Sequence, residues 1–265
     1  MLPRGLIKIT LLLSSSLTVM AGSLIAPALP QIADYFHEHN QAEYLSKLIL
    51  TTPALMISLL ASPAGYLLDK INKRVLFICA VILYALSGSI AYFLDNMYHI
   101  IISRVFLGIS VAIIMTTATT LIGDYFEGDE RNKFLGTQAA FMALGGTVFV
   151  ALAGVLADIS WRYPFLLYLF SVPVIVLVLT FLKEPNTSED SQEESSESNE
   201  RSFKRAPIVW AYVATFFGMA LFYVIPVQSP FLLEQIGIEK ESLLGVGVIV
   251  ATLFAAAASR LHPIL

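Results

Sequence analysis

The chain has few charged residues and almost no cysteine. Of its 265 residues, 14% are charged and 57% are hydrophobic, whereas an ordinary soluble domain has about 25% charged and about 45–50% apolar residues. The single cysteine, Cys79, excludes internal disulfides and cysteine-rich metal sites. A chain this apolar has more hydrophobic surface than one core can bury. The composition therefore excludes a soluble globular enzyme, a disordered protein and a nucleic-acid binder, and it predicts a lipid bilayer as the solvent.

The net charge of −4 comes from one segment of the chain. Residues 184–205 contain seven acidic and three basic residues, so the rest of the chain is neutral. This segment is rich in serine and poor in apolar residues, and we expect it to be a disordered cytoplasmic linker. It divides the chain into an N-terminal bundle (residues 1–183), the linker (residues 184–205) and a partial C-terminal bundle (residues 206–265).

Long runs without Asp, Glu, Lys or Arg recur along the chain. Seven such runs have about the 20 residues needed to cross roughly 30 Å of hydrocarbon, and an eighth is interrupted only by Arg104. The runs are continuously apolar and too long to be strands of a barrel. The sequence therefore predicts an all-α membrane protein with eight spans, at residues 9–29, 48–68, 75–94, 98–122, 134–157, 163–182, 206–233 and 243–259.

Basic residues are distributed unequally between the two sides of these spans. If the N-terminus lies in the cytoplasm, twelve Lys and Arg residues lie inside and three lie outside: Lys47, Arg162 and Lys240. Cytoplasmic loops of membrane proteins carry an excess of basic residues. We therefore expect a multi-pass protein of the cell inner membrane whose N-terminus is cytoplasmic.

The connection between the second and third spans carries an ordered motif, AGYLLDKINKRVLF. Its order of glycine, aspartate and paired bases resembles the signature loop of the major facilitator superfamily, with Asn72 in place of the second glycine. Because asparagine also tolerates a positive φ, we expect the turn to survive. The matching residues are Gly65, Asp69, Lys70, Asn72, Lys73 and Arg74.

The resemblance implies that this loop forms a conformational latch with charges at the foot of the fourth span. Asp124 is the matching acid, and Arg131 lies nearby in the sequence. Charge clusters at a closing seam can adopt two alternative arrangements. We expect the neighbouring acids Glu127, Asp129 and Glu130 only to solvate the loop.

Arg104 is the only charge inside a predicted span. An arginine at that depth costs several kcal/mol unless it is paired, snorkels to the surface or faces water, and the sequence leaves these alternatives open. The pattern RVFLG resembles the fourth span of the family, in which an arginine is followed four residues later by a glycine, here Gly108. The resemblance implies a part in proton coupling. However, no predicted span contains a carboxylate that could carry the proton.

The fifth span has half of the signature of proton-driven drug exporters. Gly136, Gly145 and Gly154 have the spacing of the glycine run in those proteins. Residues 149, 150 and 153 are Phe, Val and Ala, where a glycine, a kinking proline and the last glycine are expected. The following WRYPF also resembles bacterial exporters, so an antiport mechanism is favoured but left open.

Prolines lie at matching places in the two parts of the chain. Pro27 and Pro30 are at the outer end of the first span, and Pro226 and Pro230 are at the outer end of the seventh. Helix breaks at corresponding positions point to a transporter core. In this family the first, fourth and seventh spans line the cavity, and the candidates here are Met20, Ser23, Arg104, Tyr223 and Gln228. Packing is the alternative for Met20, Ser23 and Tyr223, whereas the amide of Gln228 needs a partner near lipid.

The resemblance implies a secondary active transporter that moves a small solute by alternating access, with proton-coupled efflux of an amphipathic compound or drug preferred. The family fold has twelve helices in two halves, so a chain of eight spans is expected to be truncated. The alternatives are a transport-incompetent fragment or membrane scaffold, and a facilitator-type transporter of another small metabolite. The spans hold no paired Asp, no Ser with His or Lys and no metal cluster, so we expect no enzyme, metal or cofactor. The expected partners are lipid, a solute and protons; the oligomeric state stays open.

Overall fold

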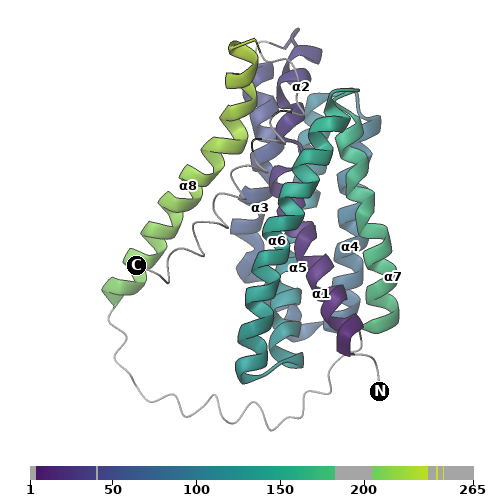
Figure 1. The fold of residues 1–265 in the computed structure, drawn as a ribbon, viewed down its shortest axis with the longest axis vertical. Helices are drawn as coiled ribbons and strands as arrows, with labels where there is room; N and C mark the ends of the chain where they lie inside the picture. Colours follow the sequence, from purple (N-terminus) through teal and green to yellow (C-terminus); the bar gives the residue numbers. More distant parts are fainter. Residues whose placement is uncertain (1–3, 40, 183–204, 238–242, 244–246, 248–265) are drawn as a thin grey trace.

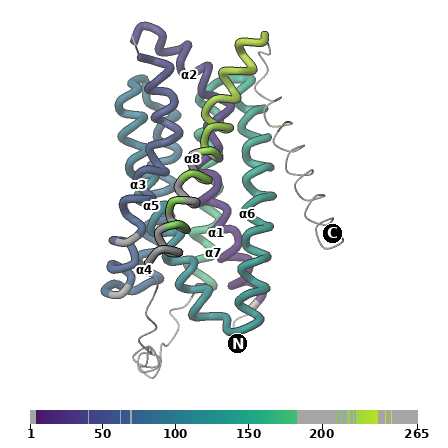
Figure 2. The backbone as a smooth tube through the Cα atoms, turned by 90° about the vertical axis from the view of Figure 1, so that its left-hand side faces the viewer, coloured from purple at the N-terminus to yellow at the C-terminus, as the bar shows by residue number. Residues whose placement is uncertain are grey.

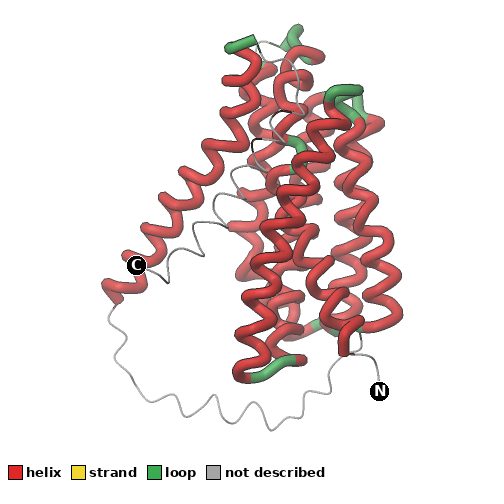
Figure 3. The backbone as a smooth tube through the Cα atoms, in the orientation of Figure 1, coloured by secondary structure: helices red, strands yellow, loops and turns green. Residues whose placement is uncertain are grey.

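The computed structural model describes residues 4–39, 41–182, 205–237, 243 and 247. Within these ranges the ordered elements are all helices, as Figure 3 shows, which confirms the predicted all-α fold. In chain order they are α1 (Arg4–Ser23), η1 (Ala26–Ala28), α2 (Leu29–Tyr35), α3 (Ala42–Lys70), α4 (Lys73–Ser89), η2 (Ile90–Phe93), α5 (Met97–Tyr125), α6 (Gly128–Ala157), η3 (Tyr163–Phe170), α7 (Ser171–Phe181) and α8 (Arg205–Gln235).

The described helices follow the predicted spans closely. Six helical segments before residue 182 are long and apolar enough to cross a membrane, and α8 covers the seventh predicted span. The predicted linker up to residue 204 and almost all of the eighth span lie outside the described residues. Large apolar side chains remain exposed on the outside of the bundle, among them Leu59, Leu86 and Phe93. Such a surface suits lipid rather than water.

Two asparagines begin long helices by capping them. Asn96 accepts hydrogen bonds from the backbone of Tyr98 (2.9 Å) and His99 at the start of α5. Asn72 accepts one from the backbone of Val75 (3.0 Å) at the start of α4. Asn72 has φ −49°, so the connection forms without the positive φ that asparagine tolerates. Asn72 is the N-cap of α4, a position that favours asparagine for its side-chain oxygen.

The matching prolines have different effects in the two parts of the chain. Pro27 lies in η1 and Pro30 in the first turn of α2, so the 20-residue helix α1 is followed by two short helical pieces. In contrast, Pro226 and Pro230 lie inside α8, which is described as one helix. The sixth predicted span also differs from a uniform α-helix, because it begins as the 3₁₀-helix η3, with Pro164 in its first turn, and continues as α7.

The elements from α1 to α7 form one bundle with α5 near its centre (Figure 1). The most extensive contacts of α5 are with α3 and α4. We call the end that carries α2 the upper end and the end that carries the α5–α6 connection the lower end. Helix α8 contacts η1 and α2, and it leans away from the bundle toward its lower end (Figure 1). Viewed from the side in Figure 2, α8 crosses in front of the face between α3 and α6.

Candidate functional site

A cavity of about 170 Å³ lies between α1, α5 and α6. Its wall has four uncharged polar side chains, two methionines and three small or branched apolar side chains. The lining residues are Ser15, Thr18, Met115, Ala118, Thr119, Leu135, Gln138, Ala139 and Met142. This mixture of flexible apolar groups with a few hydrogen-bonding groups is typical of small-molecule sites.

Helical spacing places these side chains on one wall. On α6 the lining positions are separated by three, one and three residues, and on α5 by three and one, so each helix presents a single stripe. Gln138 Nε2 donates to Ser15 Oγ at 2.6 Å, and Ser15 Oγ donates to the carbonyl of Leu11 at 2.8 Å. This chain of hydrogen bonds holds the Gln138 amide at the wall between α1 and α6.

Two adjacent glycines allow α6 to approach α1 beside this cavity. A Cβ atom at Gly146 would lie 2.6 Å from Val19 Cγ1, and one at Gly145 would lie 3.1 Å from Ser16 Oγ. Gly136 has no atom within 4 Å of such a position, and Gly154 is buried in α6. Thus Gly145, among the predicted glycines, lies at the α1–α6 contact, and Gly146 was missed.

The predicted cavity residues lie elsewhere. Met20 is fully buried in the apolar core and is not among the residues that line this cavity. Ser23 Oγ donates to the carbonyl of Val19 at 3.1 Å, and Tyr223 Oη would lie 3.1 Å from a Cβ at Gly22. Gln228 is exposed on α8. The sequence did offer an indication of the cavity wall: in the first span, the polar residues Ser15 and Thr18 are about one helical turn apart and therefore lie on the same side of the helix.

Arg104 is buried inside the bundle, with 1% of its surface exposed. Its Nη2 donates to the carbonyls of Gly88 (2.9 Å) and Ser87 (3.2 Å), and its guanidinium carbon lies about 5 Å from the ring centres of Phe165 and Tyr168. Of the alternatives left open, Arg104 is therefore paired: it neither snorkels nor lines the cavity. Main-chain carbonyls and aromatic faces compensate part of its charge, whereas its buried Nη1 has no hydrogen-bond partner in the described structure.

Glycines provide the close contacts around Arg104. A Cβ at Gly88 would lie 2.4 Å from Tyr168 Cγ, so only glycine permits this ring to pack against α4. A Cβ at Gly108 would lie 2.5 Å from Met56 Cβ and 2.8 Å from the carbonyl oxygen of Pro53. The glycine four residues after Arg104 therefore brings α5 against α3.

At the lower end, the loop motif and the foot of α5 come together. Lys73 Nζ lies 2.8 Å from Asp124 Oδ2, and Arg74 Nη2 donates to the carbonyl of Leu179 at 2.5 Å. Glu130, which we expected only to solvate the loop, forms an ion pair with Lys8 at 2.8 Å. These contacts link α4 to α5 and α7, and α1 to α6, within the N-terminal bundle.

The remaining residues of the motif have separate surroundings. Lys70 Nζ lies 4.3 Å from the ring centre of Tyr66. The guanidinium of Arg131 packs beside Gly123, 3.7 Å from the position of a Cβ there. Gly65 lies inside α3 with open space at its Cβ position. The side chain of Asp69 lies outside the described part of the structure.

At the upper end, Arg162 joins three segments. It donates to Asp95, to the carbonyl of Tyr92 (3.2 Å) and to Tyr35 Oη (3.3 Å), and it lies 4.7 Å from the ring centre of Trp161. The hydrogen bond to Asp95 raises the pKa of the Arg162 guanidinium above its ordinary value. The WRYPF motif thus fastens α2, the α4–α5 connection and the corner between α6 and η3.

Sequence comparisons find proteins that are similar to this chain. A sequence model of the Major Facilitator Superfamily matches residues 11–264. Multidrug transporter protein MdtP of Bacillus subtilis (strain 168) is 25% identical over 180 residues, which cover 68% of this chain and 32% of MdtP. Multidrug resistance protein 1 of the same organism is 25% identical over 224 residues, which cover 82% of this chain and 56% of that protein.

A solved structure has the same fold. The crystal structure of a D-xylose-proton symporter matches with a TM-score of 0.76 at 15% identity, covering 99% of this chain and 70% of the symporter chain. The two Bacillus proteins are longer, and this chain spans 32% and 56% of their lengths.

Proposed function

The chain belongs to the major facilitator superfamily, a family of transporters and not of enzymes, and from that premise we propose that it serves proton-coupled efflux of a small amphipathic compound. The observation that carries this proposal is the uncharged cavity between α1, α5 and α6. The multidrug transporters among the relatives support the direction of transport and the class of solute.

The chemistry of the cavity selects the solute. Hydroxyl and amide groups of Ser15, Thr18 and Gln138 offer hydrogen bonds, and Met115 and Met142 offer adaptable apolar contacts. A carboxylate or phosphate entering this cavity loses its hydration without meeting an opposite charge on the wall, which is costly. A neutral compound, or a cation whose charge is spread over an aromatic ring system, avoids that cost.

The arrangement of α8 suits alternating access. Helix α8 meets the N-terminal bundle at the upper end and diverges from it toward the lower end (Figure 1). If the lower end faces the cytoplasm, as the distribution of basic residues predicts, this is an inward-facing arrangement. The ion pairs Lys73–Asp124 and Lys8–Glu130 then keep the lower ends of the N-terminal helices together while the two parts of the transporter move.

Efflux of ethidium from cells that express the protein tests this proposal, since ethidium is an amphipathic cation with delocalised charge. The variant Gln138→Leu removes the amide from the cavity wall, and Thr137→Val changes the neighbouring polar residue of α6, which is not among the lining residues. We expect Gln138→Leu to slow efflux roughly fivefold to tenfold, the equivalent of about one hydrogen bond, and Thr137→Val to leave it unchanged. Equal efflux by Gln138→Leu and the unchanged protein would refute the assignment of the cavity.

A further inference from the structure

A second, open cavity of about 310 Å³ lies where the end of α8 meets α2 and α3. Its apolar wall and its ionisable groups come from all three helices and from the α2–α3 connection. The lining residues are Pro30, Ala33, Asp34, His37, His39, Ala42, Glu43, Phe231 and Glu234. We call this contact between α8 and the α2–α3 corner the upper seam. It is distinct from the uncharged cavity between α1, α5 and α6.

Three carboxylates face one another across the upper seam. Asp34 comes from α2, Glu43 from α3 and Glu234 from the last turn of α8, beyond the predicted span. Lys47 Nζ pairs with Glu43 at 2.6 Å and lies 4.7 Å from the ring centre of Phe231. One lysine therefore neutralises one of the three acids and also contacts α8.

The two histidines of the seam are engaged on the side of α2 and α3. The ring of His37 lies 2.7 Å from the carbonyl oxygen of Asp34, and the ring of His39 packs beside Phe36 and Tyr98. Residues 239–241, which also include charged groups, lie outside the described residues.

Closing the seam places Glu234 in less favourable surroundings for a negative charge. Glu234 keeps much of its surface exposed, and partial desolvation together with the carboxylates of Asp34 and Glu43 raises its pKa above the ordinary value of 4.5. When the upper ends separate, water replaces these neighbours and the cause of the shift is removed. Of the three carboxylates, only Glu234 belongs to α8. Its protonation therefore depends on how close α8 lies to α2 and α3.

We propose that the upper seam is a pH-sensitive contact, in which uptake of a proton at Glu234 favours the closed upper end and release of that proton favours its opening. The proposal rests on the proposed function for its biological meaning. If the upper end faces outward, a proton taken from outside drives the protein toward the inward-facing arrangement, which is the direction that proton-driven efflux requires. The spans predicted from the sequence contain no carboxylate, and Glu234, which lies just beyond the seventh of them, supplies a protonation site.

The sign of the pH dependence follows from linkage. A carboxyl whose pKa is raised in the closed state favours closure fully below its open-state pKa, and this bias is lost as the pH rises through the closed-state pKa. Between low and high pH, the ratio of molecules with a closed upper end to those with an open one therefore falls. The total fall is about tenfold for each unit by which closure raises the pKa of Glu234.

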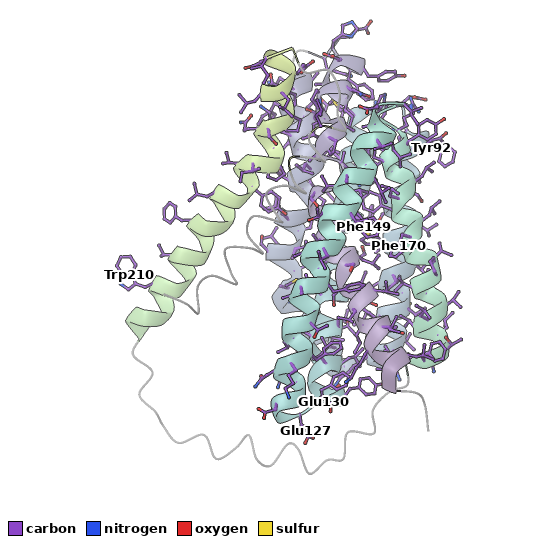
Figure 4. The ribbon with its side chains drawn as sticks, in the orientation of Figure 1. Tyr92, Glu127, Glu130, Phe149, Phe170 and Trp210 are labelled. Atoms are coloured by element: carbon purple, nitrogen blue, oxygen red, sulfur yellow. The ribbon has the colours of Figure 1, made fainter. Side chains whose placement is uncertain are left out.

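Distance measurement between two spin labels tests the proposal without any transported solute. The labels are placed at Trp210→Cys and Lys133→Cys in a Cys79→Ser background, on exposed positions near the lower ends of α8 and α6. Figure 4 shows Trp210 pointing away from the bundle, so neither label touches the seam. Closure of the upper end separates these lower ends.

We expect longer distances to dominate at pH 5 and shorter distances to gain population at pH 8. Glu234→Gln should hold the long distance at both pH values, whereas Glu38→Gln, which removes an exposed carboxylate outside the cavity lining, should respond like the unchanged protein. Glu43→Gln removes one facing charge and should move the midpoint to lower pH. A pH response that survives in Glu234→Gln, or no response in the unchanged protein, would overturn the proposal. The ethidium assay can fail independently of this result.

Discussion

The contact between α3 and α5 depends on Gly108 having no side chain. A Cβ at this position would lie 2.5 Å from Met56 Cβ, 2.8 Å from the carbonyl oxygen of Pro53 and 2.9 Å from Pro53 Cα. Ordinary van der Waals contact of a Cβ begins at 3.4 Å. Since two of these atoms belong to the backbone of α3, the strain cannot be relieved by a rotamer change. We therefore expect Gly108→Ala to separate the two helices or to distort one of them.

The size of the effect follows from the overlap. Overpacking a well-packed core costs about 1–3 kcal/mol, and each kcal/mol lowers the melting temperature by about 2–4 °C for a domain of comparable size. Gly136→Ala is the matched control, because nothing lies within 4 Å of its added methyl group. There the exchange gains helix propensity, up to about 1 kcal/mol.

Thermal unfolding of the detergent-solubilised protein, followed by fluorescence-detected size exclusion, measures both variants. We expect Gly108→Ala to melt several degrees below the unchanged protein and Gly136→Ala to melt at or above it. Equal melting temperatures for the two variants would show that the α3–α5 contact does not need a glycine. The packing explanation of the pattern RVFLG would then be wrong.

Three further predictions concern charged residues. Arg104→Leu leaves two buried carbonyls of α4 unpaired and should cost about 1–3 kcal/mol for each group, seen as a lower melting temperature; an unchanged value would contradict the pairing. A double-mutant cycle on Lys73→Ala and Asp124→Asn should give a coupling free energy of about 0.2–1 kcal/mol, since this pair is partly exposed. A coupling of zero would show that the ion pair does not stabilise the contact between α4 and α5. The pKa of Arg162 is raised in the folded protein, so the stability that Arg162 contributes is lost only when the pH rises above the ordinary arginine value. Asp95→Asn should therefore lower the melting temperature equally at pH 7 and pH 9. A difference between the two would show that another group titrates in this range.

The spans could be predicted from the sequence because their signal is local. A run of about 20 residues without charge specifies a membrane helix by length and hydrophobicity, and α3, α5 and α6 follow the predicted runs with additions at their ends. The signature motif also placed Lys73 and Asp124 on neighbouring helices, where the structure brings them together. These features depend on one segment or on one motif.

The cavity residues could not be predicted in the same way. A helix that is apolar on all sides gives little information on its rotation about its own axis. Met20 and Ser15 are both buried residues of α1, yet only Ser15 is among the residues that line the cavity. Which side of α1 faces the cavity depends on how α1 packs on its neighbours, including α6, which it approaches closely at Gly145 and Gly146.

The partners of Arg104 were hidden for a different reason. The sequence has no carboxylate in the predicted spans, so a search for an opposite charge finds none. The structure instead offers the carbonyls of Ser87 and Gly88, together with two aromatic rings. Carbonyl groups are present at every residue and leave no mark in the composition.

Uptake of ethidium into everted membrane vesicles tests the proposed transport most directly. Ethidium carries a permanent charge, so a pH gradient alone does not concentrate it as it would a weak base. With the vesicle interior acidic, we predict accumulation above that of vesicles without the protein, loss of accumulation when the gradient is collapsed, and slower uptake by Gln138→Leu. Accumulation that equals that of vesicles without the protein, or that persists without a pH gradient, would contradict proton-coupled efflux.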